Sequence, residues 1–175
     1  MTIADKTDTM TLADKIERLI VIPQRIAEYE QNRKRFLGAK SPDFGDKPSS
    51  GTKSNSTEMK NVEYADYGKR IDELKRERDK LAMEIQQEVD ERLSGELEND
   101  IELRKVVKAS FIDFRTIETI AKSVIYRSKN RASDLFHLGC ERLAIPNETM
   151  DRVRKWSRRL AQLEKDKENL LSEKE

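Results

Sequence analysis

Residues 106–143 decide the fold of this chain, and they read VVKASFIDFRTIETIAKSVIYRSKNRASDLFHLGCERL. Their apolar positions predict three short helices, of which the first ends near residue 112, the second covers 116–124 and the third runs from Ser128 to about Leu143. Thr116 and Ser128 stand at N-cap positions, where a hydroxyl accepts a hydrogen bond from an otherwise unpaired backbone amide. Three short helices with capped turns between them are what a helix-turn-helix requires.

The second and third of these helices need small and apolar contact faces. Ile117, Ile120 and Ala121 are predicted to point inward, and the small side chain of Ala121 lets the two helices approach closely. Ala132 and Leu135 are predicted to form the inner face of the third helix. The opposite face of the third helix is then free to meet a ligand.

The outer face of the third helix carries side chains that suit duplex DNA. Arginine and lysine contact phosphates and guanine, asparagine pairs with adenine, and the amides at a helix N-terminus favour a phosphate. The candidate DNA-binding residues are Arg127, Ser128, Lys129, Asn130, Arg131, Ser133 and Asp134. The alternative is a purely structural helical hairpin, because such hairpins are common in helix-rich chains.

Two long helices are predicted upstream of this region. The first begins near Thr11 and ends at Gly38, and Pro23 is expected to kink it or to divide it into two helices. The second covers 61–94 with apolar residues at heptad spacing, which indicates a coiled coil either with the first helix or with a second copy of the chain. Residues 38–60 between them are rich in Gly, Pro and Ser and predict a flexible linker.

A final long helix is predicted after Pro146, over about 148–172, with Asn147 as its cap. The predicted fold is therefore all-α, with a coiled-coil hairpin of long helices, a C-terminal helix-turn-helix and a last long helix. The predicted segments are an N-terminal helical segment at 1–37, the linker at 38–60, the long coiled-coil helix at 61–95, the helix-turn-helix domain at 96–145 and the C-terminal helix at 146–175.

The composition excludes several classes of protein. Of the 175 residues, 35% are hydrophobic and 39% are charged, against roughly a quarter charged in an ordinary domain. The single Cys140 excludes an internal disulfide, and the single His137 argues against a histidine metal site or a Ser-His-Asp triad. With no glycine-rich phosphate loop either, we expect no enzymatic activity, metal, cofactor or small-molecule substrate. No apolar run is long enough for a membrane span and no secretory leader is evident, so a cytoplasmic protein is expected.

The charges are distributed unevenly along the chain. Residues 61–103 hold 7 basic and 14 acidic groups, whereas residues 104–159 hold 14 basic and 6 acidic groups. Because a polyanion responds to the local field, a nucleic-acid surface is expected within 104–159. A second basic cluster there offers either phosphate contacts or only a solvated helix face. Its members are Arg152, Arg154, Lys155, Arg158 and Arg159.

Residues 106–143 resemble the helix-turn-helix of sigma factor region 4. Over about 11–143 the chain is also similar to a family of small phage and prophage proteins of Gram-positive bacteria, grouped as a domain of unknown function. The matching motifs are Ser41-Pro42-Asp43-Phe44, Ile71-Asp72-Glu73-Leu74 and Phe111-Ile112-Asp113-Phe114-Arg115-Thr116-Ile117-Glu118, followed by Ile120-Ala121. The chain departs from the family between Ala121 and Ser128, where its turn is one residue longer and holds neither glycine nor asparagine.

The resemblance implies a phage-type transcriptional regulator, akin to the ArpU and RinA activators, that reads duplex DNA through a recognition helix at about 128–143 in a bacterial host. The heptads of the long helices predict a homodimer, which would place two recognition helices about 34 Å apart. Host RNA polymerase or another protein is a further expected partner. The alternative function is a coiled-coil adaptor or inhibitor that binds a repressor, a polymerase subunit or a packaging component.

Overall fold

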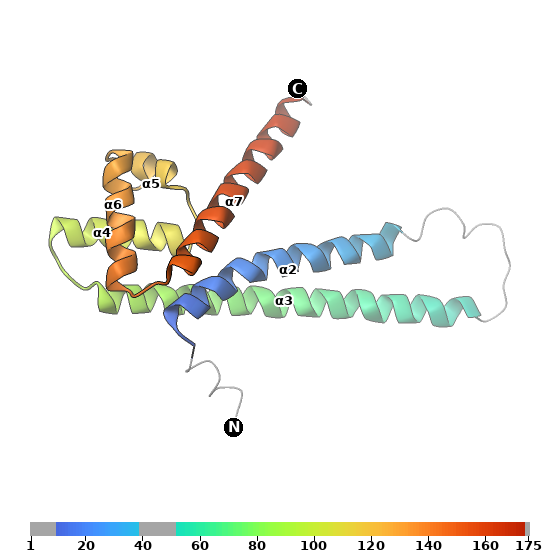
Figure 1. Cartoon of the computed structure of the whole chain (residues 1–175). Helices are drawn as coiled ribbons and strands as arrows, with labels where there is room; N and C mark the ends of the chain where they lie inside the picture. The colour runs from blue at the N-terminus through green and yellow to red at the C-terminus, as the bar shows by residue number, and fades with distance from the viewer. Residues whose placement is uncertain (1–9, 39–51, 174–175) are drawn as a thin grey trace. The chain divides into compact units, whose positions relative to one another are not determined.

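The computed structural model describes residues 10–38 and 52–173. All the regular structure in these residues is helical (Figure 1), which confirms the all-α prediction. The helices are α2 (Leu12–Gly38), α3 (Thr52–Arg92), α4 (Glu98–Phe111), α5 (Ile117–Ser123), α6 (Lys129–Arg142) and α7 (Asn147–Glu173). The chain divides into two compact units: unit 1 contains residues 10–20 and 81–173, and unit 2 contains residues 21–38 and 52–80.

The long helices differ from the prediction at the linker and exclude one of the two arrangements expected at Pro23. Helix α3 begins at Thr52, so the C-terminal part of the predicted linker 38–60 is helical, although its polar composition gives no apolar periodicity. Helix α2 is not divided at Pro23, because buried Ile22 and Ile26 anchor the helix around the hydrogen bond that the proline removes; the kink expected as the alternative stays a prediction. The predicted flexibility of 39–51 and a docking role for Phe44 lie outside the described residues.

The pairing of the long helices takes place within one chain. In unit 2, the rings of Tyr29 and Tyr67 lie 5.9 Å apart, and the guanidinium of Arg33 stacks 3.9 Å from the centre of the Tyr64 ring. In unit 1, Lys15 of α2 pairs with Glu84 of α3 at 3.5 Å. These contacts join α2 to an antiparallel α3 of the same molecule, which was one of the two arrangements left open by the heptads.

The core of unit 1 lies where α6 crosses α4. The rings of Phe111 and Phe136 are 5.7 Å apart, and both side chains are buried. At Gly139, α6 comes so close to α4 that an added Cβ would stand 2.4 Å from Cγ2 of Val107. The predicted inner face is largely confirmed: the buried positions are Ile120, Ala121, Ala132 and Leu135, while Ile117 is only half-buried.

The first half of helix α7 packs against the other helices of unit 1. Met150, Val153 and Trp156 are buried, so the predicted packing role of Trp156 is confirmed. The side chains from Gln162 to Glu173 are all exposed. Helix α7 begins at Asn147, directly after Pro146, so Asn147 is the first helical residue rather than the predicted cap.

Each connection between consecutive helices from α4 to α7 contains one residue with a left-handed backbone. These residues are Phe114, Tyr126 and Ala144, with φ of 50°, 54° and 53°. Left-handed backbone is unusual outside glycine, and here it reverses the chain within a few residues. Tyr126 therefore performs, in the turn between α5 and α6, the role for which the sequence supplies no glycine or asparagine.

Candidate nucleic-acid interface

The N-terminus of α6 is formed as the sequence predicts. Ser128 is the N-cap, and its hydroxyl accepts a hydrogen bond of 3.2 Å from the backbone amide of Arg131. Thr116 caps α5 in the same way through the amide of Thr119. The polar face of α6 is not buried by its neighbours, since Lys129, Asn130 and Asp134 are exposed. This face is therefore open to a large ligand.

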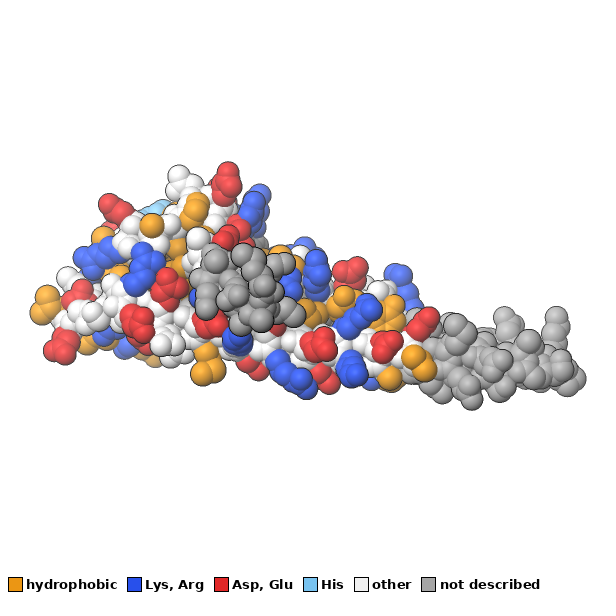
Figure 2. All heavy atoms as spheres, turned by 90° about the horizontal axis from the view of Figure 1, so that it is seen from below, with side chains coloured by type: hydrophobic (Ala, Val, Ile, Leu, Met, Phe, Trp, Pro, Cys, Tyr) orange, Lys and Arg blue, Asp and Glu red, His pale blue; other side chains and the backbone are white. Residues whose placement is uncertain are grey.

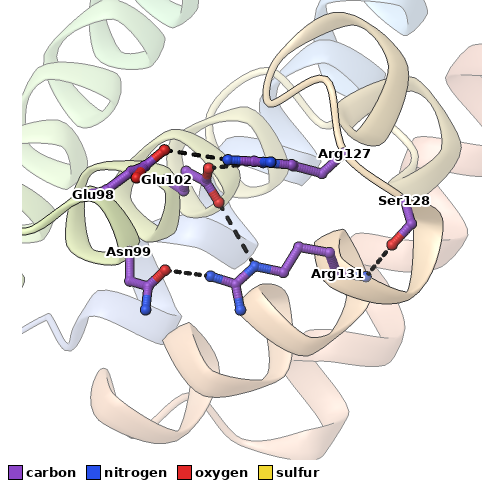
Figure 3. A network of polar contacts seen from close by, with 6 residues as sticks. All are labelled: Glu98, Asn99, Glu102, Arg127, Ser128 and Arg131. Carbon is purple, nitrogen blue, oxygen red and sulfur yellow. Dashed lines mark hydrogen bonds and ion pairs between the residues drawn. The ribbon is translucent and has the colours of Figure 1, made fainter.

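Two of the predicted DNA contacts, Arg127 and Arg131, pair with side chains of α4 (Figure 3), while their own side chains stay 52% and 38% exposed. Arg127 donates through Nε to Glu102 and through Nη2 to Glu98, each at 3.2 Å. Arg131 donates through Nη2 to the Asn99 side chain at 2.6 Å, and its Nε lies 3.7 Å from Glu102. In this arrangement the positive charge of both guanidinium groups is therefore paired with polar side chains of α4.

Lys129, the third cation of the predicted set, lines an open hollow between α5, α6 and α7. We call it the α6–α7 hollow. It has a volume of about 380 Å³. Lys129, Asn130 and Ser133 contribute to it from α6, and Arg154 and Arg158 contribute from α7. The remaining lining residues are Thr116, Ile117, Glu118, His137 and Ser157. The structure thus joins part of the predicted DNA-binding set to part of the second basic cluster.

The α6–α7 hollow carries three cations and one carboxylate. Lys129 pairs with Glu118 at 2.9 Å. The hydrogen bond from Lys129 lowers the pKa of Glu118 below its ordinary value, and the charges of Lys129 and Arg158 act in the same direction. Because both partners are mostly exposed, a phosphate can replace Glu118 at the lysine at little cost.

His137 and Phe136 fix the position of Arg154. Nη2 of Arg154 lies 3.0 Å from Nε2 of His137, which is hydrogen-bond distance. The Arg154 guanidinium also lies 5.4 Å from the centre of the Phe136 ring, which is cation–π distance. Arg154 is therefore held over α6, on the rim of its polar face.

Sequence reasoning missed His137, Arg154 and Arg158 as members of one surface. The spacing of these residues in the sequence does indicate shared helix faces. Arg154 and Arg158 are four residues apart and lie on one side of a helix, and the same holds for Ser133 and His137. What the sequence could not supply was the packing of α7 beside α6. Asp134 is exposed but lies outside the lining of the hollow.

The charge on other parts of the surface is mixed. On the face drawn in Figure 2, basic and acidic side chains alternate among the described residues. The exposed side of α6 itself bears Asp134 and Glu141 beside its cations. Arginines of α7 are therefore needed to make the region around α6 attractive to a polyanion.

The described residues contain no cluster of three or more His, Cys, Asp or Glu side chains placed to hold a metal ion. No helix among them is both long enough and apolar enough to cross a membrane. Comparison with models of known protein families, with curated proteins and with solved structures found no match. The likeness of residues 11–143 to the phage proteins and to sigma factor region 4 therefore stays a prediction.

Proposed function

We propose that this protein binds duplex DNA through the outer face of α6, flanked by Arg154 and Arg158 of α7, and that it acts as a phage-type regulator of transcription. The observation that carries the proposal is the α6–α7 hollow. It brings Lys129, Asn130 and Ser133 of α6, a helix whose opposite face is buried, together with Arg154 and Arg158 of α7 on one open surface.

The dimensions and side chains of α6 suit a major groove. Its 14 residues span about 21 Å, and a helix of ordinary width fits a groove about 12 Å wide. Asn130 and Ser133 supply the hydrogen-bonding groups that can read base edges. Lys129, Arg154 and Arg158 supply the charges that contact phosphates, which set the register but carry no sequence information.

The test measures binding of a fluorescein-labelled, mixed-sequence 30-bp duplex by anisotropy while the salt concentration is varied. We expect a dissociation constant between about 10⁻⁶ and 10⁻⁴ M for non-specific binding, weakening steeply between about 50 and 200 mM salt. Arg154→Ala/Arg158→Ala is expected to reduce the slope of log K against log salt by about 2, since each phosphate contact contributes about 0.9.

The chain offers a matched control on the same helix. Lys155 and Arg159 are exposed and lie outside the hollow, so Lys155→Ala/Arg159→Ala makes the same change in net charge at the wrong place. This variant is expected to bind nearly as the unaltered protein does. Equal losses from both variants, or no binding of duplex at low salt, would rule out the proposed surface.

A coiled-coil adaptor is the second candidate function, and the exposed end of α7 favours it. Leu163, Leu170 and Leu171 are 46%, 60% and 67% exposed. Leu163 and Leu170 continue the heptad spacing of buried Val153 and Trp156 beyond the core of unit 1. If this stripe joins two copies of the chain, Leu163→Glu/Leu170→Glu lowers the sedimentation coefficient. Leu97→Glu, at a side chain that is 75% exposed and lies outside α7, serves as the control.

A further inference from the structure

The arginines at the start of α6 share one partly buried acceptor. The side chain of Glu102 is only 13% exposed, and its two oxygens face Nε of Arg127 and Nε of Arg131. Glu98 is 80% exposed and adds a second carboxylate to Arg127. The cluster therefore joins two acidic side chains of α4 to two basic side chains beside the proposed DNA-binding face (Figure 3).

This arrangement removes charge from the DNA-binding surface. An arginine beside a carboxylate presents less net charge to a phosphate further away, and Nε and Nη2 of Arg127 and Nη2 of Arg131 are already donating. The side-chain amide of Asn99 occupies a further donor of Arg131 at 2.6 Å. To turn these engaged N–H groups and their full charge to a phosphate, either arginine must exchange the oxygens of α4 for those of the DNA backbone.

We propose that Glu98, Asn99 and Glu102 compete intramolecularly with the DNA backbone for Arg127 and Arg131. This inference rests on the proposed function and concerns how DNA binding at the same surface is regulated. While the α4 cluster is intact, the protein binds through Lys129, Arg154 and Arg158. When the two carboxylates are neutralised, Arg127 and Arg131 add phosphate contacts of their own, and binding becomes tighter and more sensitive to salt.

The experiment neutralises the cluster without changing its size. Glu98→Gln/Glu102→Gln is compared with Glu141→Gln/Glu148→Gln, which makes the same change in net charge at exposed positions away from both arginines. We expect the first variant to steepen the salt dependence of duplex binding by about 2 in log K against log salt, at about 0.9 per added phosphate. The control variant is expected to keep the slope of the unaltered protein.

A double-mutant cycle identifies the groups responsible. Arg127→Gln/Arg131→Gln in the otherwise unaltered chain is expected to leave the slope unchanged, because these arginines are already occupied. In the Glu98→Gln/Glu102→Gln background it is expected to abolish the gain. A loss of about 2 in the slope on removing the arginines from the unaltered chain would overturn the inference, since they would then already contact DNA.

Elution from immobilised heparin separates this inference from the proposed function. Heparin is a polyanion without base pairs, so the Glu98→Gln/Glu102→Gln variant is expected to elute at higher salt than the control variant whether or not duplex DNA is the ligand. Elution of both variants at the same salt overturns the competition. Failure to bind the duplex, with the heparin difference retained, overturns only the proposed ligand. Glu98→Gln alone changes an exposed side chain and provides a readout if the double variant folds poorly.

Discussion

Gly139 is a residue at which α6 comes close to α4. A Cβ at this position would stand 2.4 Å from Cγ2 of Val107 and 3.4 Å from Cδ1 of Leu103. The side chain of Val107 is branched at Cβ and fully buried, so it cannot rotate away freely. The small side chain of Ala121 was predicted to let α5 and α6 approach closely, and Ala121 is buried; Gly139 adds a close approach between α6 and α4.

Gly139→Ala is therefore expected to lower the free energy of unfolding by about 1–3 kcal/mol, the usual effect of overpacking. Urea unfolding followed by circular dichroism measures this change. Gly68→Ala is the matched control, because its Cβ would meet only the flexible end of Arg33 at 3.5 Å. Alanine at Gly68 is expected to stabilise α3 by about 0.5–1 kcal/mol. Destabilisation by both variants to the same extent would contradict the packing of α6 on α4.

Cys140 is a buried thiol in the same helix. Burial raises its pKa to about 12, although the charge of Arg154 acts in the opposite direction. In the unfolded chain the thiol ionises near its ordinary value of 9.0, so a rise of pH from about 9 toward 12 favours unfolding. The reactive species is the thiolate.

We expect the folded protein to resist iodoacetamide at mildly alkaline pH, whereas the protein in concentrated guanidinium chloride is alkylated readily. Mass spectrometry of the single cysteine measures both rates. Equal rates in the two conditions would show that Cys140 is not enclosed.

The individual buried residues of 106–143 could be predicted from sequence, because apolar spacing and hydroxyl caps are local signals. The partners of Arg127 and Arg131 could not be. Glu98 and Glu102 lie 25 or more residues earlier in the chain, and only the packing of α4 against α6 brings them close. A cation on an exposed helix face looks available for DNA until its tertiary neighbours are known.

At the scale of elements, short turns with left-handed residues determine how α4, α5, α6 and α7 follow one another. Helix boundaries between residues 98 and 142 were predicted to within two residues, since Thr116 and Ser128 act through local hydrogen bonds. The start of α3 was not predicted, because polar residues at 52–60 resemble a linker in composition. Composition therefore identified the turns but did not distinguish a polar helix from a linker.

The turn between α6 and α7 offers a stabilising substitution. Ala144 is exposed and has φ of 53°, and a left-handed alanine costs about 1–2 kcal/mol relative to ordinary helical backbone. Ala144→Gly relieves this strain but increases the entropy of the unfolded chain, so a net gain of up to about 1 kcal/mol is expected. Thermal unfolding measures the gain.

Ala161→Gly within α7 is the control for this substitution, because it replaces a half-buried alanine in regular helix. It is expected to lose up to about 1 kcal/mol. A lower melting temperature for Ala144→Gly would show that this turn does not adopt the left-handed conformation in solution.

At the scale of the whole molecule, the candidate interface belongs entirely to unit 1. Every lining residue of the α6–α7 hollow, and every member of the cluster around Glu102, lies between residues 98 and 158. Unit 2 contributes paired segments of α2 and α3 and no side chain to either group. The total charge of +1 therefore says little about the proposed DNA binding, for which the candidate cations all belong to unit 1.

Replacement of residues 21–80 by a short Gly-Ser loop tests this division. Ile20 and Leu81 end the two segments of unit 1 that pair through Lys15 and Glu84, so a short loop can join them. We expect the shortened protein to keep its helical spectrum and its affinity for a single duplex site. Retained folding with lost affinity would show that unit 2 contributes to binding, as the predicted dimer of long helices requires.

Trp156 gives the molecule an internal optical probe. It is the single tryptophan of the chain and is buried, in the same helix as Arg154 and Arg158. An indole that leaves an apolar contact for water shifts its emission to longer wavelength. The fluorescence of the unlabelled protein will therefore reveal whether binding of a nucleic acid exposes Trp156 to water or leaves the packing of α7 unchanged.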